Sequence, residues 1–292
     1  AKAAFLESIG MELIYRSYYD YKDKQLTVFP AYRIAGSAKA IDAHTGEAVD
    51  LYGYGRVFYP LADEAKGAGG MGGIDERNLT KEELEAIEKL GKLLTKDDAI
   101  VKLTEQIPLS IKSMDMTRTS LRKDAVDGEK YIWEIFFDKL YGAVDARTGE
   151  LLNYSYYGDD TDGKRDLTKD VARKIAESFL QKVAADKFSQ SVYVPDYMED
   201  IVFVREEEKP EAYSFRYHRS VNGAAFIDNG FAVTVDRKTG NITYYNCNWF
   251  EKAIFPSIAD VLTDAEMMNE MTKEYSFDIV YEKTGKDGNP DL

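Results

Sequence analysis

The heptapeptide Val144-Asp145-Ala146-Arg147-Thr148-Gly149-Glu150 decides the fold, because close copies of it occur twice more in the chain. The copies are Ile41-Asp42-Ala43-His44-Thr45-Gly46-Glu47 and Val235-Asp236-Arg237-Lys238-Thr239-Gly240-Asn241. An Asp can accept hydrogen bonds from the backbone two residues on, and Gly tolerates positive φ, so each copy predicts a tight turn between two strands. The residues predicted to form these structural turns are Asp42, Thr45, Gly46, Asp145, Thr148, Gly149, Asp236, Thr239 and Gly240.

The sequences beside the turns predict antiparallel strands. β-Branched and aromatic residues dominate 131–137 and 151–154 around the second turn, and 231–235 and 242–245 around the third. The spacing between the Asp residues is irregular, 103 residues and then 91. A solenoid keeps a fixed short period, so the repeat is interpreted as a small domain with variable loops.

Helical patterns lie upstream of the second and third turns. Residues 168–187 begin at the N-cap residue Thr168, with a predicted apolar stripe of Val171, Ile175, Phe179, Leu180 and Val183. Residues 95–107 have the same opening and end at Pro108. Capping boxes are predicted at Thr80 with Glu83 and at Thr263 with Glu266. Each repeat is therefore predicted as one helix followed by three or four antiparallel strands.

This order of helix, hairpin and Val-Asp-Ala-x-Thr-Gly-Glu is similar to the PepSY domain, and its recurrence resembles the YcdB/YcdC repeated-domain family. The resemblance rests on Tyr32-Arg33 before the first turn, on 213–249 around the third turn, and on Phe255-Pro256-Ser257 after it. It implies an α+β fold of tandem PepSY-like modules, each a helix packed on a three- to four-stranded antiparallel sheet. The third copy has Asn241 in place of Glu, which indicates that Asp-x-x-Thr-Gly is the structural part of the motif.

The two chain ends shape the predicted domain organisation, because 3–15 and 265–281 each suggest a short helix running into a strand. The Gly-rich stretch 66–74 has no Gly-Lys-Ser/Thr ending, so a linker is favoured over a phosphate-binding loop. The predicted segments are a PepSY-like module lacking its beginning at 1–62, a Gly-rich linker at 63–78, PepSY-like modules at 79–160 and 161–250, and the start of a further module or a C-terminal extension at 251–292.

Composition excludes several classes of protein. The chain has 292 residues, a net charge of −14, one Cys and two His. A disulfide scaffold and a Cys/His zinc cluster both lack the necessary residues, and so large a negative charge argues against nucleic-acid binding. No apolar run approaches the ~18 residues of a membrane helix, and the first residues show no signal-peptide pattern. The family resemblance implies a secreted or cell-surface protein of Gram-positive bacteria.

Few residues offer catalytic or metal-binding chemistry. His44 lies in a turn where the other copies have Arg147 and Lys238, and His218 lies within a predicted strand, so neither is predicted to be a base. Cys247 is predicted to be a half-buried strand residue. The acidic loop 158–166 lacks EF-hand spacing, so a solvated loop is favoured over a weak cation site. We predict no catalytic residues, no metal site and no cofactor; a carboxylate pair assembled by folding stays open.

The predicted function is therefore non-enzymatic binding outside the cytoplasm. The family resemblance implies a partner that is a protein or peptide, such as a peptidase that the chain binds or inhibits, and we expect an extended peptide to add to the antiparallel sheets. The alternative is a cell-wall glycan-binding module that uses exposed tyrosines, which cluster at 18–21, 52–59 and 154–157. A hydrolase is the third alternative. The binding residues themselves are not specified by the sequence.

Overall fold

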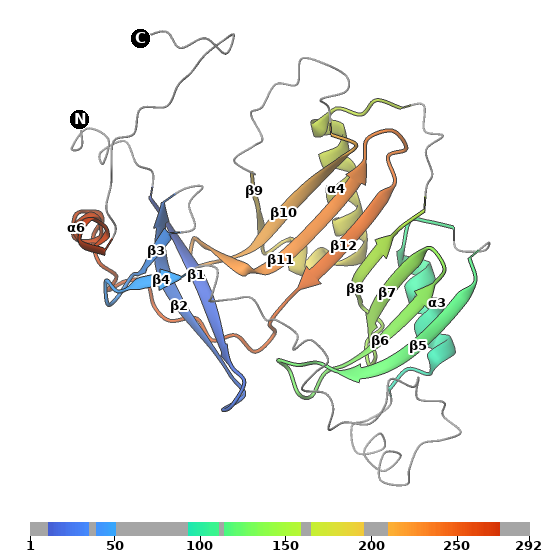
Figure 1. The fold of residues 1–292 in the computed structure, drawn as a ribbon, viewed down its shortest axis with the longest axis horizontal. Coiled ribbons are helices and arrows are strands. Elements are labelled where there is room, and N and C mark those ends of the chain that lie inside the picture. The colour runs from blue at the N-terminus through green and yellow to red at the C-terminus, as the bar shows by residue number, and fades with distance from the viewer. Residues whose placement is uncertain are drawn as a thin grey trace, which may run out of the picture.

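The structure is a computed structural model of the chain. It describes residues 11–34, 39–50, 93–110, 114–158, 165–195 and 210–274. The fold is mixed α+β and is dominated by sheet, with few helices (Figure 1). The strands are β1 (Met11–Asp20), β2 (Gln25–Ile34), β3 (Lys39–Asp42), β4 (Ala48–Asp50), β5 (Met116–Lys123), β6 (Tyr131–Phe137), β7 (Leu140–Asp145), β8 (Leu151–Tyr156), β9 (Ser191–Val194), β10 (Ala212–Val221), β11 (Ala224–Asp236) and β12 (Ile242–Asn248). The described helices are α3 (Lys96–Gln106), α4 (Lys169–Val183), α5 (Ala185–Phe188) and α6 (Asp264–Glu274).

One sheet joins all twelve strands in the order β4-β3-β2-β1-β11-β12-β8-β7-β6-β5, with β10 pairing to β11 and β9 pairing to β10. Neighbouring strands are antiparallel except where β1 meets β11 in parallel. That parallel ladder covers only two residue pairs, Ile14 with Ala225 and Tyr15 with Phe226. The first hairpin is thus joined to the rest of the sheet by a short connection.

Most local sequence predictions are confirmed. The stretches predicted as strands around the second and third turns lie in β6, β8, β11 and β12. Helix α3 is capped by Thr95 and ends before Pro108, and α4 is capped by Thr168. The capping box at α6 is present, because Glu266 accepts from Thr263 N (2.8 Å) and Glu266 N donates to Thr263 Oγ1 (3.3 Å). The box predicted at Thr80 and the Gly-rich stretch 66–74 lie outside the described residues.

The apolar stripe predicted for α4 is partly wrong. Val171 is exposed, whereas Ala172 and Ala176 are fully buried together with Leu180. The small alanine side chains let the helix backbone approach the sheet closely, and this turns the neighbouring Val171 toward solvent.

The three Asp-x-x-Thr-Gly turns have the same backbone geometry. Their glycines have φ values of 77° at Gly46, 75° at Gly149 and 76° at Gly240. Each glycine N–H donates to the carbonyl of the Asp four residues before it, at 2.9–3.0 Å. Each Asp Oδ1 also accepts the backbone N–H groups two and three residues on. The motif closes its own turn, since the carboxylate replaces solvent for two N–H groups.

Each turn packs against a helix that begins after a Leu-Thr pair. A Cβ added to Gly46 would lie 2.9 Å from Glu270 of α6, and one added to Gly149 would lie 2.8 Å from Lys102 of α3. For Gly240 the nearby α4 residue is Ile175, at 3.7 Å. We call each turn, with its flanking strands and its helix, a turn–helix unit. The helices of the first, second and third units are α6, α3 and α4.

Three apolar clusters lie between these elements. The largest contains the buried residues of α3 and α4 and one face of β6–β8 and β10–β12. A second cluster joins α6 to the first hairpin and contains Tyr32, Ile41, Ala43, Met267 and Met271. In the third, the segment 250–258 covers Tyr15, Val28, Ala224 and Phe226. Helix α6 lies in the segment predicted as a further module or an extension, and it packs on the segment predicted as the first module. The module boundaries themselves stay a prediction.

Candidate functional site

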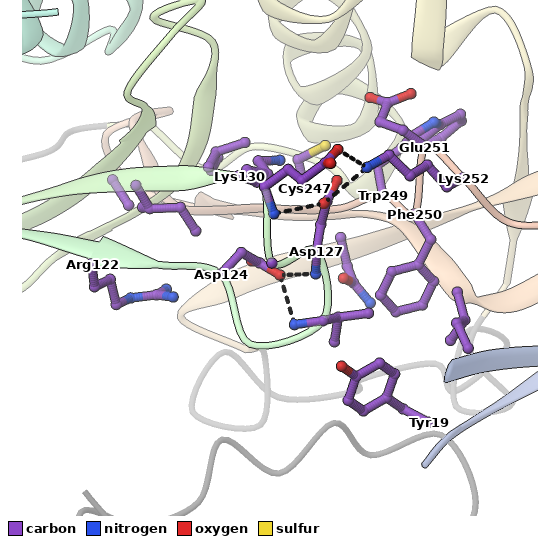
Figure 2. A pocket seen from close by; sticks show the side chains of 18 of the residues that line it. Tyr19, Arg122, Asp124, Asp127, Lys130, Cys247, Trp249, Phe250, Glu251 and Lys252 are labelled. Atoms are coloured by element: carbon purple, nitrogen blue, oxygen red, sulfur yellow. Dashed lines mark hydrogen bonds and ion pairs between the residues drawn. The ribbon is translucent and has the colours of Figure 1, made fainter. Parts of the chain in front are cut away.

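A groove of about 780 Å³ lies on the sheet face opposite α3 (Figure 2). Three segments far apart in the sequence form it: the tip of the β1–β2 hairpin, the loop between β5 and β6, and the chain from 246 to 252. The volume falls in the range typical of ligand-binding clefts. The groove is the candidate functional site.

The floor of the groove is apolar. It is formed by Ile132 of β6, Ala143 of β7 and Leu152 of β8, which cluster on the face away from the largest core. A bulge in the pairing of β7 with β8 between Ala143 and Val144 lets Leu151 join the core while Leu152 joins the floor. The local irregularity of β8 therefore supplies the groove with a large aliphatic side chain.

Amide side chains border this floor. Asn153 Nδ2 donates to Asn246 Oδ1 at 2.9 Å, linking β8 to β12 across their pairing. Asn248, two residues on, donates to the carbonyl of Asp228. Amides offer both donors and acceptors, so an apolar floor edged by amides suits a ligand that carries amide or hydroxyl groups.

The β5–β6 loop forms a charged rim whose acids already have partners. Asp124 Oδ1 accepts the N–H groups of Val126 (2.9 Å) and Asp127 (2.8 Å). Lys252 Nζ contacts Asp127 at 3.2 Å and Glu129 at 2.6 Å. These contacts fix the loop against the segment that follows β12, as the dashed lines in Figure 2 show.

Aromatic rings complete the walls. Tyr19, at the hairpin tip, faces the β5–β6 loop, and burial together with the nearby carboxylate of Asp124 raises the pKa of its hydroxyl. Phe250, from the chain after β12, also lines the groove and packs against Phe226 with 6.2 Å between ring centroids. The groove thus has one wall from the first hairpin and one from the chain after β12.

The structure places the two histidines and the cysteine away from any catalytic arrangement among the described residues. His44 is an exposed turn residue. Cys247, predicted to be half-buried, is buried on β12, and burial raises the pKa of its thiol to about 12, so it stays protonated near neutral pH. The part of the chain that the structure describes contains no group of three or more His, Cys, Asp or Glu residues placed to hold a metal ion.

A buried polar cluster lies where the first hairpin joins β11. Between Phe226 and Gly230, β11 bulges away from β10, and Asp228 in this bulge contacts Arg16 of β1 at 3.2 Å. Asp228 also accepts the N–H of Ser17 at 2.7 Å. Burial raises the pKa of Asp228 to about 6, against the opposing effect of Arg16. Burial lowers the pKa of His218, on β10 beside the bulge, to about 4.

The tyrosine clusters prove to be mixed. Tyr154 is fully buried and donates to the carbonyl of Ile242 at 2.9 Å, so it belongs to the core. Tyr157, Tyr18 and Tyr21 are exposed, and Tyr19 lines the groove. The tyrosine cluster at 52–59 lies outside the described residues, as does most of the acidic loop 158–166.

The nine turn residues lie at the turn–helix contacts and not in the groove. Sequence reasoning missed the groove residues and the Asp228 cluster. Asn246 and Asn248 gave a weak signal, because amides alternating with Tyr245 and Cys247 on β12 indicate a polar sheet face. Nothing in the sequence pairs Arg16 with Asp228.

Comparison with known proteins adds the family. The model of the YcdB, YcdC repeated domain matches residues 112–249. This segment is therefore similar to a YcdB/YcdC repeated domain. The repeated domain includes the second and third turns and both sides of the groove floor, while the first turn lies outside it.

Two further comparisons give little more. The Bacillus megaterium YpeB C-terminal domain is similar to this chain with a TM-score of 0.39 and 11% identity, over 68% of this chain and 73% of that chain. No curated protein matches the chain. Among the described residues, no helix combines the length and the apolar character that crossing a membrane requires.

Proposed function

We propose that the chain is a non-enzymatic binding protein of tandem PepSY-like modules, secreted or displayed on the cell surface, and that it binds an extended peptide in the groove. The single observation that carries this is the groove itself, with its apolar floor of Ile132, Ala143 and Leu152 bordered by amides. We favour a peptidase as the partner, because an extended, substrate-like segment of a peptidase would suit the groove.

The tandem organisation is supported by the three turn–helix units. Each pairs a helix with an antiparallel hairpin through the same set of backbone contacts. The apolar residues at the fourth and eighth positions after each N-cap face the sheet: Ala99 and Leu103 in α3, Ala172 and Ala176 in α4. We infer one module for each unit, with its helix packed on its own strands.

Peptide binding is supported by the position of β5 beside the groove. β5 is the last strand in the order of the sheet, and its Arg122 lines the groove. A peptide that pairs with the outer edge of β5 would extend its following residues over the groove floor. Main-chain pairing supplies affinity in such complexes, and the groove supplies selectivity for the side chain that enters it.

Filling the groove tests the proposal. Ala143→Leu adds three carbon atoms to the floor. Ala232→Leu is its control, because Ala232 lies on β11, on the same face of the sheet, but outside the groove. We expect calorimetry with a panel of extended peptides and secreted peptidases to find a ligand that Ala143→Leu weakens at least about tenfold and Ala232→Leu does not. Silence of the unchanged chain across the panel, or equal effects of both variants, would contradict it.

Cell-wall glycan is the second candidate, and Tyr19 favours it. An aromatic ring beside amides can stack on a sugar while the amides bind hydroxyl groups. Tyr19→Ala with purified cell wall separates the two candidates: we expect loss of wall binding only if glycan is the ligand. The hydrolase alternative has the weakest support, because the groove acids Asp124, Asp127 and Glu129 are engaged in the loop contacts described above.

A further inference from the structure

The first turn–helix unit takes its helix from the opposite end of the described chain. In the second and third units the helix precedes the strands it covers, as the positions of α3 and α4 in Figure 1 show. In the first unit the strands β1–β4 come first, and α6 follows more than 200 residues later. The helix-binding surface of this unit is therefore filled by a segment that reaches it from elsewhere.

The backbone contact at the start of α6 recurs at the starts of the other two helices. The residue before each N-cap donates its N–H to the residue after the turn Asp: Leu262 to Ala43 (2.8 Å), Leu94 to Ala146 (2.7 Å) and Leu167 to Arg237 (3.1 Å). Because one set of contacts recurs three times, the first hairpin presents a specific receptor for a helix of this pattern.

Side chains repeat the correspondence. Met267 and Met271 are the fourth and eighth residues after the N-cap Thr263, the positions that Ala99 and Leu103 occupy in α3. The carbonyl of Leu262 accepts from Tyr32 Oη at 3.2 Å, as the carbonyl of Leu94 accepts from Trp133 Nε1 at 2.9 Å. The required ligand is thus an amphipathic helix with a Leu-Thr start and apolar residues at these two positions.

Among the described residues, α6 packs on fewer strands than α3 and α4 do. The described contacts place α6 against β3, in a cluster of five buried residues. Helix α3 packs against β6, β7 and β8 within the largest cluster, and α4 packs against β10 and β11. A helix with little buried surface and a specific docking pattern is the one that leaves and returns most readily.

We propose that the surface formed by Tyr32, Ile41, Ala43 and Gly46, the helix receptor, accepts α6 from a second copy of this chain in place of its own α6. Two copies would then associate by exchanging α6, with every contact of the receptor preserved. The proposal rests on the contacts of α6 and is independent of what the groove binds.

A variant with a disabled α6 tests the exchange. Met267→Glu with Met271→Glu puts two charges into the buried cluster, so the variant's own α6 leaves the receptor open. Ala265→Glu with Asn269→Glu is the matched control, because it adds the same charge on exposed positions of α6. Trp133 and Trp249 belong to the largest cluster, and their fluorescence reports whether the rest of the chain stays folded.

The probe is a labelled synthetic peptide of residues 259–274. We expect saturable one-to-one binding to the Met267→Glu/Met271→Glu chain, and binding at least about tenfold weaker to the unchanged chain and to the control, where α6 occupies the receptor. The same peptide carrying both Glu substitutions should not bind. Native mass spectrometry of the disabled chain mixed with the unchanged chain should show a mixed dimer.

Two results would overturn the proposal: no peptide binding by the disabled chain although hydrogen exchange shows that β1 and β2 stay protected, or only monomers in the mixture at every concentration. If the first hairpin of the disabled chain opens, Met271→Ala replaces it, because truncation weakens the seat without placing a charge there. That variant should bind the peptide more tightly than the unchanged chain does, and equal binding also overturns the proposal.

Discussion

The first turn–helix unit and the second show the same contacts made under different constraints. The helix of the second unit lies just upstream of its own strands and is buried in the largest apolar cluster. The helix of the first unit comes from the far end of the described chain. Its unit meets the rest of the sheet through a two-pair ladder, a buried ion pair and the small apolar cluster that contains Tyr15 and Phe226. Identical local geometry therefore does not give equal stability, because the surrounding core decides how much a contact contributes.

Truncating Leu103 should cause the largest loss of stability, because this side chain lies in the largest apolar cluster. Leu103 of α3 is fully buried, and Leu103→Ala should lower the free energy of unfolding by about 3 kcal/mol through lost apolar contact and a residual cavity. Urea denaturation followed by tryptophan fluorescence measures it. Val101→Ala, on the half-exposed face of the same helix, is the control and should change stability by less than about 0.5 kcal/mol. Equal effects would mean that α3 does not contribute to the core as described.

Truncating Met271 should have a smaller and local effect. Met271→Ala removes buried surface at the position equivalent to Leu103, at a cost of about 2 kcal/mol. Because the cluster around α6 is separate from the largest one, we expect faster hydrogen exchange in β2 and β3 and little change in the tryptophan-detected midpoint. A fall of that midpoint as large as for Leu103→Ala would break the comparison, since the first unit would then unfold with the rest.

The pH dependence should reveal the polar junction between the first hairpin and β11. The pKa of Asp228 is raised to about 6 in the folded chain, so the protonated carboxyl stabilises the fold. This contribution is complete below the pKa of Asp in the unfolded chain and is lost as pH rises toward 6. The lowered pKa of His218, about 4, contributes stability above pH 6.5 that is lost as pH falls toward 4. Arg16 faces Asp228 and partly offsets the rise of its pKa, whereas Arg33 and Arg216 add to the fall of the His218 pKa. Because the two pKa values shift in opposite directions, the two contributions oppose each other between pH 4 and 6.

Removing His218 should expose the contribution of Asp228. Between pH 6.5 and pH 4, the free energy of unfolding of His218→Gln should rise by on the order of 2 kcal/mol relative to that of the unchanged chain. This magnitude follows from a pKa difference of about two units between the folded and unfolded states. Asp228→Asn should shift the profile in the opposite direction. His44→Gln, at an exposed turn, serves as the control and should follow the unchanged chain. Parallel profiles for all three variants would show that neither buried group titrates between the two states.

The smallest effects should come from the turns. The Asp236 carboxylate accepts three hydrogen bonds, including one from Thr239 Oγ1 at 2.7 Å, whereas Asp42 and Asp145 each accept two within the turn. We therefore expect Asp236→Ala to cost about 1.5 kcal/mol and Asp145→Ala about 1 kcal/mol in urea denaturation. Asp42→Ala should act mainly on hydrogen exchange in the first hairpin. The reverse order at Asp236 and Asp145 would indicate that the contacts around each turn outweigh its own hydrogen bonds.

What the sequence predicts correctly is local. The Asp-x-x-Thr-Gly copies, the cap residues Thr95 and Thr168, and the strands beside the turns depend on neighbours within a few residues. The sequence did not reveal that Met267 lies against Tyr32, or that Arg16 lies against Asp228, because each pair is brought together only by the complete sheet. The groove is beyond local patterns for the same reason, since its floor and walls come from separate segments.

The late position of α6 has a consequence for the newly made chain. The apolar residues of the first hairpin are synthesised early, and Met271, which covers Ile41, follows 230 residues later. At about 5–20 residues per second, the interval lasts on the order of 10–50 s, far longer than hairpin formation itself. Throughout this interval, therefore, the apolar residues of the first hairpin lack the helix that covers them in the folded chain.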